Sequence, residues 1–171
     1  MAASWIVATD VLYDEPTRTG RGAAVAFERW EDAAPSHEWR THIDAIADYV
    51  PGSFYQRELP CLLALLDPLR EQIGTVIVDG HVWLGEGRPG LGHHLYEALE
   101  RRVAVVGVAK SRFHGGYATE VLRGTESTRP LYVTAVGLTV EAAAAYVRSM
   151  HGPYRLPTLL KRVDSLTRGL V

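Results

Sequence analysis

The chain has 171 residues, of which 47% are apolar and 22% are charged, and its formal net charge is −2 at neutral pH. This composition is ordinary for a globular protein, and the length predicts that residues 1–171 form a single domain. The small negative charge argues against a protein that coats nucleic acid by bulk electrostatic attraction. It does not exclude an enzyme with a local basic rim and metal ions in its site.

The sequence also indicates the cellular compartment of the protein. Cys61 is the only cysteine, so an internal disulfide is excluded. The N-terminus lacks a basic stretch followed by a long apolar run, so we expect no signal peptide. The longest apolar runs are too short to span a bilayer. We therefore expect a cytoplasmic protein without membrane association. The sequence leaves the oligomeric state open, and a monomer is favoured.

Three strands are predicted in the N-terminal part of the chain. Residues 4–10 form an apolar run that is typical of a buried strand, and residues 23–30 and 37–43 follow as strands two and three. Polar turns that contain proline separate them. Consecutive strands joined by short turns predict an antiparallel three-strand meander.

The pattern changes after residue 50. The predicted elements are a helix at 53–69, a strand at 75–79, a helix at 91–102, a strand at 103–108 and helices at 139–150 and 157–167. Residues 75–79 are apolar on both faces, as expected for a strand in the middle of a sheet covered by helices. The stretch between residues 113 and 132 remains unassigned. This order predicts an α/β fold with a mixed central sheet and helices on both faces.

Three acidic residues stand where an ionised carboxylate is costly. Asp10 and Asp79 each end an apolar run, and Glu58 lies on the same helical stripe as Leu62 and Leu65. A carboxylate at the edge of a core needs a cation or several hydrogen-bond donors to offset its desolvation. Three such groups brought together would form a hard-cation site, for which Mg²⁺ is the common occupant. That arrangement predicts phosphoryl chemistry on a nucleic acid.

The predicted geometry allows these acids to meet. If strands 4–10 and 75–79 are neighbours, Asp10 and Asp79 lie side by side at the carboxyl end of the sheet, where ligands of open α/β sheets bind. Glu58 would hang over the same place. The alternative for each aspartate alone is a turn cap, since Asp-Gly is a common turn pair, and it is the simpler interpretation of either one. The three acids in this order favour the metal site.

Several segments resemble one known family. They are ATDVLYDE around Asp10, YVPGSFYQRELP from Tyr49, VIVDGH around Asp79, VVGVAKSRF from Val105 and the tail PYRLPTLLKRVDSL. The chain is similar in these segments to the endonuclease V family (deoxyinosine 3′ endonuclease), of which it would be a short and divergent member. The resemblance implies a ribonuclease H-like fold and cleavage of nucleic acid near inosine.

The resemblance also implies a role for each matching residue. The family acts on deoxyinosine in DNA and, in some members, on inosine in RNA, and it cuts one phosphodiester beyond the lesion on the 3′ side. Mg²⁺ is the expected cofactor, with Mn²⁺ as the alternative. The implied catalytic residues are Asp10, Glu58, Asp79 and Lys110, of which the three acids bind metal; the implied wedge that enters the duplex is Tyr49, Val50, Pro51 and Gly52; and the implied pocket for the extruded base is lined by Gly52, Gly80, Gly90 and Leu91.

The side chains of Tyr49, Lys110 and His81 also suit these roles on physical grounds. A flipped base needs a close-fitting pocket, and an aromatic such as Tyr49 can fill the gap left in the stack. Without the resemblance, a surface tyrosine on a Pro-Gly turn is the simpler interpretation. Lys110 ends an apolar strand, so its ammonium group is expected at the sheet edge near a phosphate, or it merely leaves the core. His81 could act as a base or as a donor that supports a metal ligand.

The sequence departs from the family's pattern at a few places. Residues 132–138 lack a histidine that the family usually carries after its late strand, residues 85–87 lack a second one, and Asp48 replaces a proline. These departures leave two alternatives open: a ribonuclease H-like nuclease for another substrate, and a non-catalytic binder of modified nucleic acid. A small-molecule binding domain is a further alternative. The lack of a Gly-rich loop after the first strand argues against its nucleotide-binding version.

Overall fold

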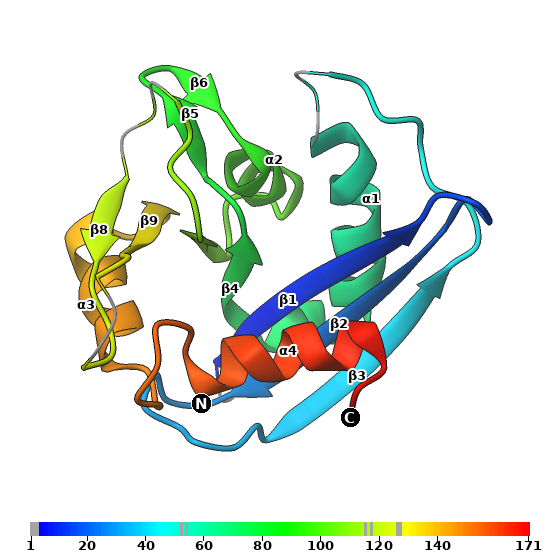
Figure 1. Cartoon of the computed structure of the whole chain (residues 1–171). Helices are drawn as coiled ribbons and strands as arrows, with labels where there is room; N and C mark the ends of the chain where they lie inside the picture. Colours follow the sequence, from blue (N-terminus) through cyan, green and yellow to red (C-terminus); the bar gives the residue numbers. More distant parts are fainter. Residues whose placement is uncertain (1–3, 52, 54, 115, 117, 126–127) are drawn as a thin grey trace.

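The computed structural model describes residues 4–171 apart from positions 52, 54, 115, 117 and 126–127. Within this described part, a seven-stranded mixed sheet has the order β3-β2-β1-β4-β7-β9-β8 (Figure 1). Its strands are β1 (Trp5–Asp14), β2 (Thr19–Phe27), β3 (His37–Ile43), β4 (Ile73–Asp79), β7 (Ala104–Ala109), β8 (Thr119–Val121) and β9 (Leu131–Val136). A separate hairpin pairs β5 (Trp83–Gly85) with β6 (Arg88–Pro89).

The described part of the chain contains four α-helices and one 3₁₀ helix, and capping residues mark one end of two of them. They are α1 (Tyr55–Leu66), a 3₁₀ helix (Asp67–Gln72), α2 (Leu91–Ala98), α3 (Val140–Ser149) and α4 (Thr158–Arg168). The Thr139 hydroxyl caps α3 by accepting from the backbone of Ala142 at 3.2 Å. Gly169 ends α4 in the left-handed conformation, with φ of 73°. None of the helices in the described part of the chain is long and apolar enough to cross a membrane.

The N-terminal meander confirms the prediction with shifted boundaries. β3 has the predicted bounds, whereas β1 continues four residues beyond Asp10 and β2 begins at Thr19 rather than at residue 23. The turn between β1 and β2 is therefore only four residues long. Because the hairpin is longer than predicted, it extends past the acid at residue 10 and reaches the segment that follows β3 (Figure 1).

The rest of the sheet is wider than predicted. β1, β4 and β7 are parallel, as expected, but β9 and β8 extend the sheet by two antiparallel strands that the sequence pattern did not reveal. The second helix ends at Ala98 and not at residue 102. Its end is set by Glu100 and Arg101, which both adopt positive φ, 58° and 60°, and such residues cannot continue a right-handed helix.

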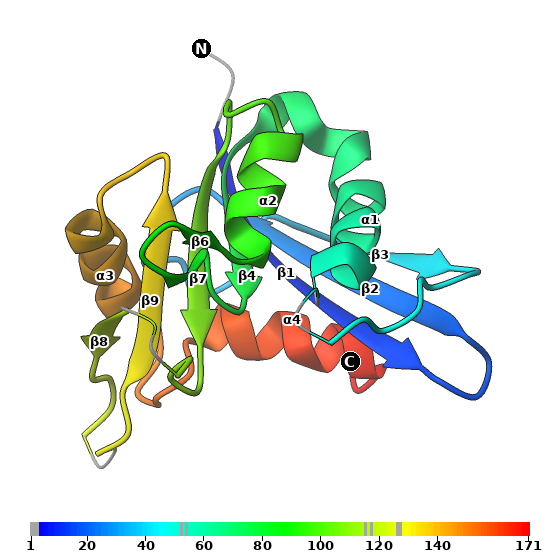
Figure 2. The ribbon, with the colours of Figure 1, turned by 90° about the horizontal axis from the view of Figure 1, so that it is seen from above.

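Helices cover both faces of the sheet, which gives two cores (Figure 2). Residues alternate between them along each strand. In β1, Ala8 packs toward α3 and α4, and its neighbour Val7 packs toward α1 and α2. The carboxyl ends of β1, β4 and β7 consequently meet at one edge, between α4 on one face and α1 on the other (Figure 2).

The loop after β4 folds back closely over β7. A side chain at Gly107 would lie 2.5 Å from the Gly80 carbonyl oxygen and 2.6 Å from Thr134 Oγ1, so only glycine fits at this position. The same Thr134 hydroxyl accepts a hydrogen bond of 2.8 Å from the backbone of Val82. This contact fixes the direction in which the chain leaves Asp79.

Candidate active site

Asp10 and Asp79 lie at the ends of adjacent parallel strands. Ala8 of β1 is paired with Ile77 of β4, and each aspartate stands two residues further along its strand. The Thr9 hydroxyl donates to the Ile77 carbonyl at 2.9 Å and holds the two strands together just before the acids. The two carboxylates thus face the same side of the sheet, toward α4. The prediction that their strands are neighbours is confirmed.

Glu58 approaches the same edge from α1. Its side chain is only 7% exposed, and its Oε2 atom is buried without a hydrogen-bond partner. The pKa of Glu58 is raised to about 8, mainly by desolvation and also by the negative charges of Asp79 and Asp10, with Arg57 opposing the shift. A carboxylate oxygen without a hydrogen-bond partner, close to two other carboxylates, lies in a negative potential that favours a cation.

Asp10 is held by the last helix. The Thr167 hydroxyl of α4 donates to Asp10 Oδ2 at 2.6 Å. The pKa of Asp10 is raised to about 6, mainly by desolvation; the Thr167 hydrogen bond opposes the shift, and Asp79 and Asp164 add to it. Asp79 is exposed on one side, but desolvation on its buried side raises its pKa. The positive charge of Lys110 opposes this shift most strongly. The acids therefore influence one another across three elements.

A pocket at the sheet edge is lined by Asp10 and Asp79, whereas Glu58 lies outside its lining. Its charged lining residues are Asp10, Asp79, Lys110 and Asp164. Lys110 follows the end of β7 and is exposed, so its ammonium group emerges beside the acids, as predicted. Apolar side chains of α4, including Leu160 and Val163, form the floor. The pocket therefore brings one cationic and three acidic side chains to the same opening.

The acids are not arranged as a finished coordination shell. Among the described residues, no group of three or more His, Cys, Asp or Glu side chains is placed to hold a metal ion. The donor set nevertheless fits a hard divalent cation, because it consists of carboxylates, one of which has a buried oxygen without a partner. Asp10 is directed to Thr167 and not to the other acids.

Two residues of this edge were missed by the sequence analysis. Asp164 lines the pocket and raises the pKa values of Asp10 and Asp79, and Thr167 binds Asp10. Asp164 is the only acid in α4 and follows the buried Leu160 by four residues, on the same stripe. This is the signal that identified Glu58, so the same reasoning could have found it.

The predicted wedge lies on the surface beyond β3. Tyr49 is 58% exposed and Val50 is 45% exposed, and Pro51 is exposed beside them. Exposed apolar side chains in succession are unusual away from a binding surface. Gly52 lies outside the described residues.

The predicted base-pocket residues surround the loop after β4. Gly80 has a φ of 145° with open space beside it, whereas a side chain at Gly90 would lie 2.5 Å from the His81 carbonyl oxygen. Leu91, the first residue of α2, is 5% exposed and packs in the core. The His81 ring is held by a 3.1 Å contact of Nε2 with the Ser111 carbonyl oxygen. Their role in base recognition stays a prediction.

Comparison with known proteins identifies the family. The model of the Endonuclease V family matches residues 1–142 of the chain. The chain belongs to the Endonuclease V family. Among curated relatives, Endonuclease V of Streptomyces avermitilis is 30% identical over an alignment that covers 95% of this chain and 79% of the relative. The resemblance noted in the sequence is thus confirmed.

Solved structures of the family have the same fold. The crystal structure of Endonuclease V from Streptomyces avermitilis matches with a TM-score of 0.77 and 25% identity, covering 99% of this chain and 82% of that one. Endonuclease V of Ciona intestinalis, in complex with a 24mer DNA containing an inosine followed by a ribo-adenosine, matches with a TM-score of 0.80 and 18% identity, covering 98% and 85%. The predicted ribonuclease H-like α/β fold is therefore confirmed.

Proposed function

We propose that this chain is a divalent-cation-dependent endonuclease of DNA repair type. It would act as one domain and cut a phosphodiester on the 3′ side of inosine or deoxyinosine. The observation that carries the proposal is the convergence of Asp10, Glu58, Asp79 and Lys110 at one sheet edge in a member of the Endonuclease V family. The inosine-containing DNA bound by the Ciona intestinalis protein supports the substrate class.

The acids have separate tasks in this proposal. Asp10 and Asp79 would hold the principal cation, Mg²⁺ or Mn²⁺, with Glu58 and Asp164 completing its negative surroundings. The cation, when bound, would supply a Lewis acid and a counter-charge for the scissile phosphate. The hydrogen bond from Thr167 keeps the Asp10 carboxylate in one orientation. Glu58 brings a buried carboxyl group, and the neighbouring Asp79 and Asp10 favour a positive ion beside it.

Lys110 and the surface loop would position the substrate. The ammonium group of Lys110 stands at the pocket rim, where it can offset charge that develops on the phosphate. Tyr49 and Val50 present exposed apolar surface that can stack in place of an extruded base. His81, fixed against the Ser111 carbonyl, would support the loop that carries the acids from β4 to the proposed base pocket.

The direct test uses labelled DNA and RNA with and without one inosine. We expect wild type to cut the inosine strands in Mg²⁺, and Asp79→Asn to lower the rate about 100-fold or more, the cost of losing one charged group that acts on the transition state. Asp67→Asn is the matched control, because Asp67 is a 62% exposed acid in the 3₁₀ helix and pairs with Arg70. Its cutting rate should equal wild type.

Other outcomes would point to the alternatives. Cutting that does not depend on inosine would identify a nuclease of the same chemistry with another substrate. Inosine-dependent binding without cutting would identify a non-catalytic binder. Undiminished cutting by Asp79→Asn would refute the assignment of the acids.

A further inference from the structure

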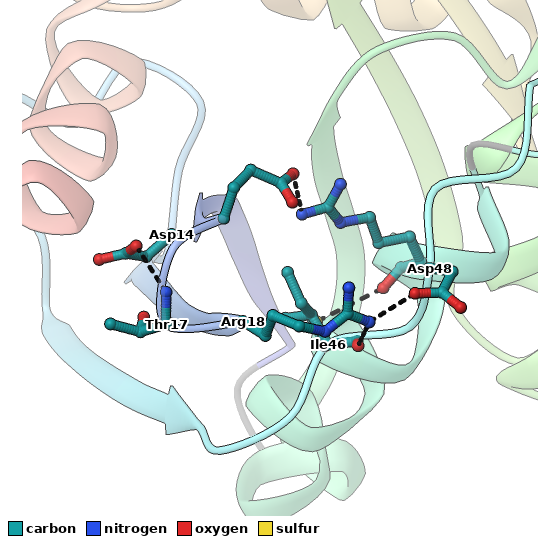
Figure 3. A network of polar contacts seen from close by, with 8 residues as sticks. Asp14, Thr17, Arg18, Ile46 and Asp48 are labelled. Carbon is teal, nitrogen blue, oxygen red and sulfur yellow. Dashed lines mark hydrogen bonds and ion pairs between the residues drawn. The ribbon is translucent and has the colours of Figure 1, made fainter.

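The turn between β1 and β2 contacts the loop that carries the proposed wedge. This loop, residues 44–54, runs from the end of β3 to the start of α1. Figure 3 shows the polar network between the turn and the loop, in which Arg18 reaches across to Ile46 and Asp48. Because β1 also carries Asp10, the turn is a covalent extension of a strand that forms the active site.

Arg18 holds the beginning of the loop. Its Nη2 atom donates to the Ile46 carbonyl at 3.3 Å and pairs with Asp48 Oδ1 at 2.5 Å. Its own carbonyl accepts from the Ile46 backbone at 3.1 Å. In the described stretch 45–51, these are the hydrogen bonds that reach beyond the loop, and Ile46 is the one buried residue, 6% exposed. The position of Tyr49 therefore depends on Arg18.

The same turn holds the other end of the loop. Glu15 forms an ion pair with Arg57 in the first turn of α1. The Arg57 side chain is only 7% exposed, and its guanidinium lies 4.2 Å from the ring centroid of Tyr13 in β1. Arg57 directly precedes Glu58. Both ends of the loop are thus tied to one turn, and the tie through Arg57 directly precedes Glu58, an acid of the site.

Stability alone does not account for an arginine at position 18. Its φ is 54°, the left-handed region, which costs a residue with a side chain about 1–2 kcal/mol and costs glycine nothing. The ion pair with Asp48 is exposed, at 56% and 81% for the two side chains. Exposed pairs of this kind contribute little. The position is locally strained, and strain of this kind is often found at functional sites.

We propose that Arg18 is a positioning residue that sets the exposed edge of Tyr49 and Val50 relative to Asp10 and Glu58. This inference rests on the proposed function. A wedge is needed only where the target base must leave a duplex, because a base in a single strand has no partner to be separated from. Loss of the anchor should therefore affect duplex substrates selectively.

The test compares Arg18→Gly with wild type on inosine-containing duplex and single-stranded DNA. We expect kcat/KM on the duplex to fall about 10–100-fold, as for a wedge displaced by an ångström, while the value on the single strand changes less than about twofold. The melting temperature should stay unchanged or rise, because glycine relieves the left-handed strain. Arg18→Lys, which keeps a cation for Ile46 and Asp48, should restore part of the duplex activity.

Arg101→Gly is the matched control. Arg101 also has positive φ, 60°, and pairs with an acid, Glu97 at 2.8 Å, but it lies before β7 at the end of the sheet opposite the acids. It should leave both activities unchanged. An equal loss on both substrates in Arg18→Gly, or no loss on the duplex, would overturn the inference.

A second measurement does not depend on activity. Chymotrypsin cleavage after Tyr49 should rise at least about fivefold in Arg18→Gly and stay at the wild-type rate in Arg101→Gly, since proteolysis follows local opening. Unchanged cleavage at Tyr49 would refute Arg18 as the anchor. If wild type cut no inosine substrate, the proposed function would fail, and the proteolysis result would still decide whether Arg18 holds the loop.

Discussion

Two charged side chains are almost equally buried in this protein, yet their surroundings differ. Arg123, after β8, is 6% exposed, and Glu58, in α1, is 7% exposed. The terminal nitrogens of Arg123 donate to four carbonyl oxygens between residues 150 and 155, including Tyr154 at 2.8 Å and Gly152 at 3.2 Å. Glu58 has a buried Oε2 without a partner and is repelled by two other carboxylates.

The comparison separates buried charge that holds structure from buried charge that is kept for a ligand. Four carbonyl oxygens accept from the two terminal nitrogens of Arg123, although its buried Nε has no partner. One of the four, at Met150, belongs to the negative end of α3. Nothing in the described protein offsets the charge of Glu58 comparably, apart from the neighbouring Arg57. We therefore expect removal of the first charge to harm folding and removal of the second to harm only activity.

The largest effect on stability is expected for Arg123→Met. Methionine keeps the apolar stem but leaves four carbonyl oxygens without a donor, and each buried unsatisfied group costs about 1–3 kcal/mol, so a total loss of about 3 kcal/mol is expected. Urea unfolding measures it. Arg148→Met, an exposed arginine in the last turn of α3, is the control and should unfold like wild type. A loss below that of the control would break the comparison.

The second largest expected effect is a gain in stability. In metal-free protein at pH 8, Glu58→Gln should raise the free energy of unfolding by at least about 1 kcal/mol, since it removes an uncompensated buried charge. For a chain of this size that corresponds to roughly 2–4 °C in melting temperature. The same substitution should abolish cutting of inosine substrates. A less stable Glu58→Gln protein would show that Glu58 has a structural role.

The pH dependence of this effect follows from linkage. The pKa of Glu58 in the folded protein, about 8, lies above its ordinary value of 4.5, so protons favour the folded state. The stabilisation is complete below pH 4.5 and is lost as the pH rises through about 8. Metal-free wild type should thus melt at a lower temperature at pH 8 than at pH 6, and Glu58→Gln should show a smaller difference. Equal slopes would contradict the burial of an uncompensated acid.

The smallest effect concerns a paired acid at the surface. Glu38 in β3 accepts two hydrogen bonds from Arg162 of α4, at 2.8 and 3.0 Å, and this bonding lowers the pKa of Glu38. Glu38→Gln should cost about 0.5 kcal/mol at neutral pH. Because a lowered pKa stabilises the fold only above the ordinary value, the difference from wild type should vanish near about pH 3 in thermal melts. A loss as large as that of Arg123→Met would remove the distinction between surface and buried pairs.

Local patterns predicted most of the fold. The meander, the helices and the parallel strands follow from apolar runs and turn residues, which act within a few positions. The strands β8 and β9 were missed because the three residues of β8 carry too little pattern and β9 directly follows an irregular stretch. The early end of α2 depends on left-handed Glu100 and Arg101, which no glycine announces.

The part of the site that depends on strand order alone could be predicted from the sequence. Asp10 and Asp79 meet because their strands are parallel neighbours, and each ends an apolar run. Asp164 could have been found from its place on the buried stripe of α4, whereas the bond from Thr167 to Asp10 depends on where α4 packs, which no local pattern fixes. The contacts of Arg18 with the loop depend on how far the hairpin extends, and its length was underestimated by four residues on the β1 side.

The hydrogen bond between Thr167 and Asp10 joins residues that are 157 positions apart. During translation the first strand leaves the ribosome long before the helix that completes its surroundings. A nascent or prematurely terminated chain lacks both this hydroxyl and the acid at position 164. In such a chain the Asp10 carboxylate has no hydroxyl donor, and the pocket at the sheet edge lacks the side that α4 supplies.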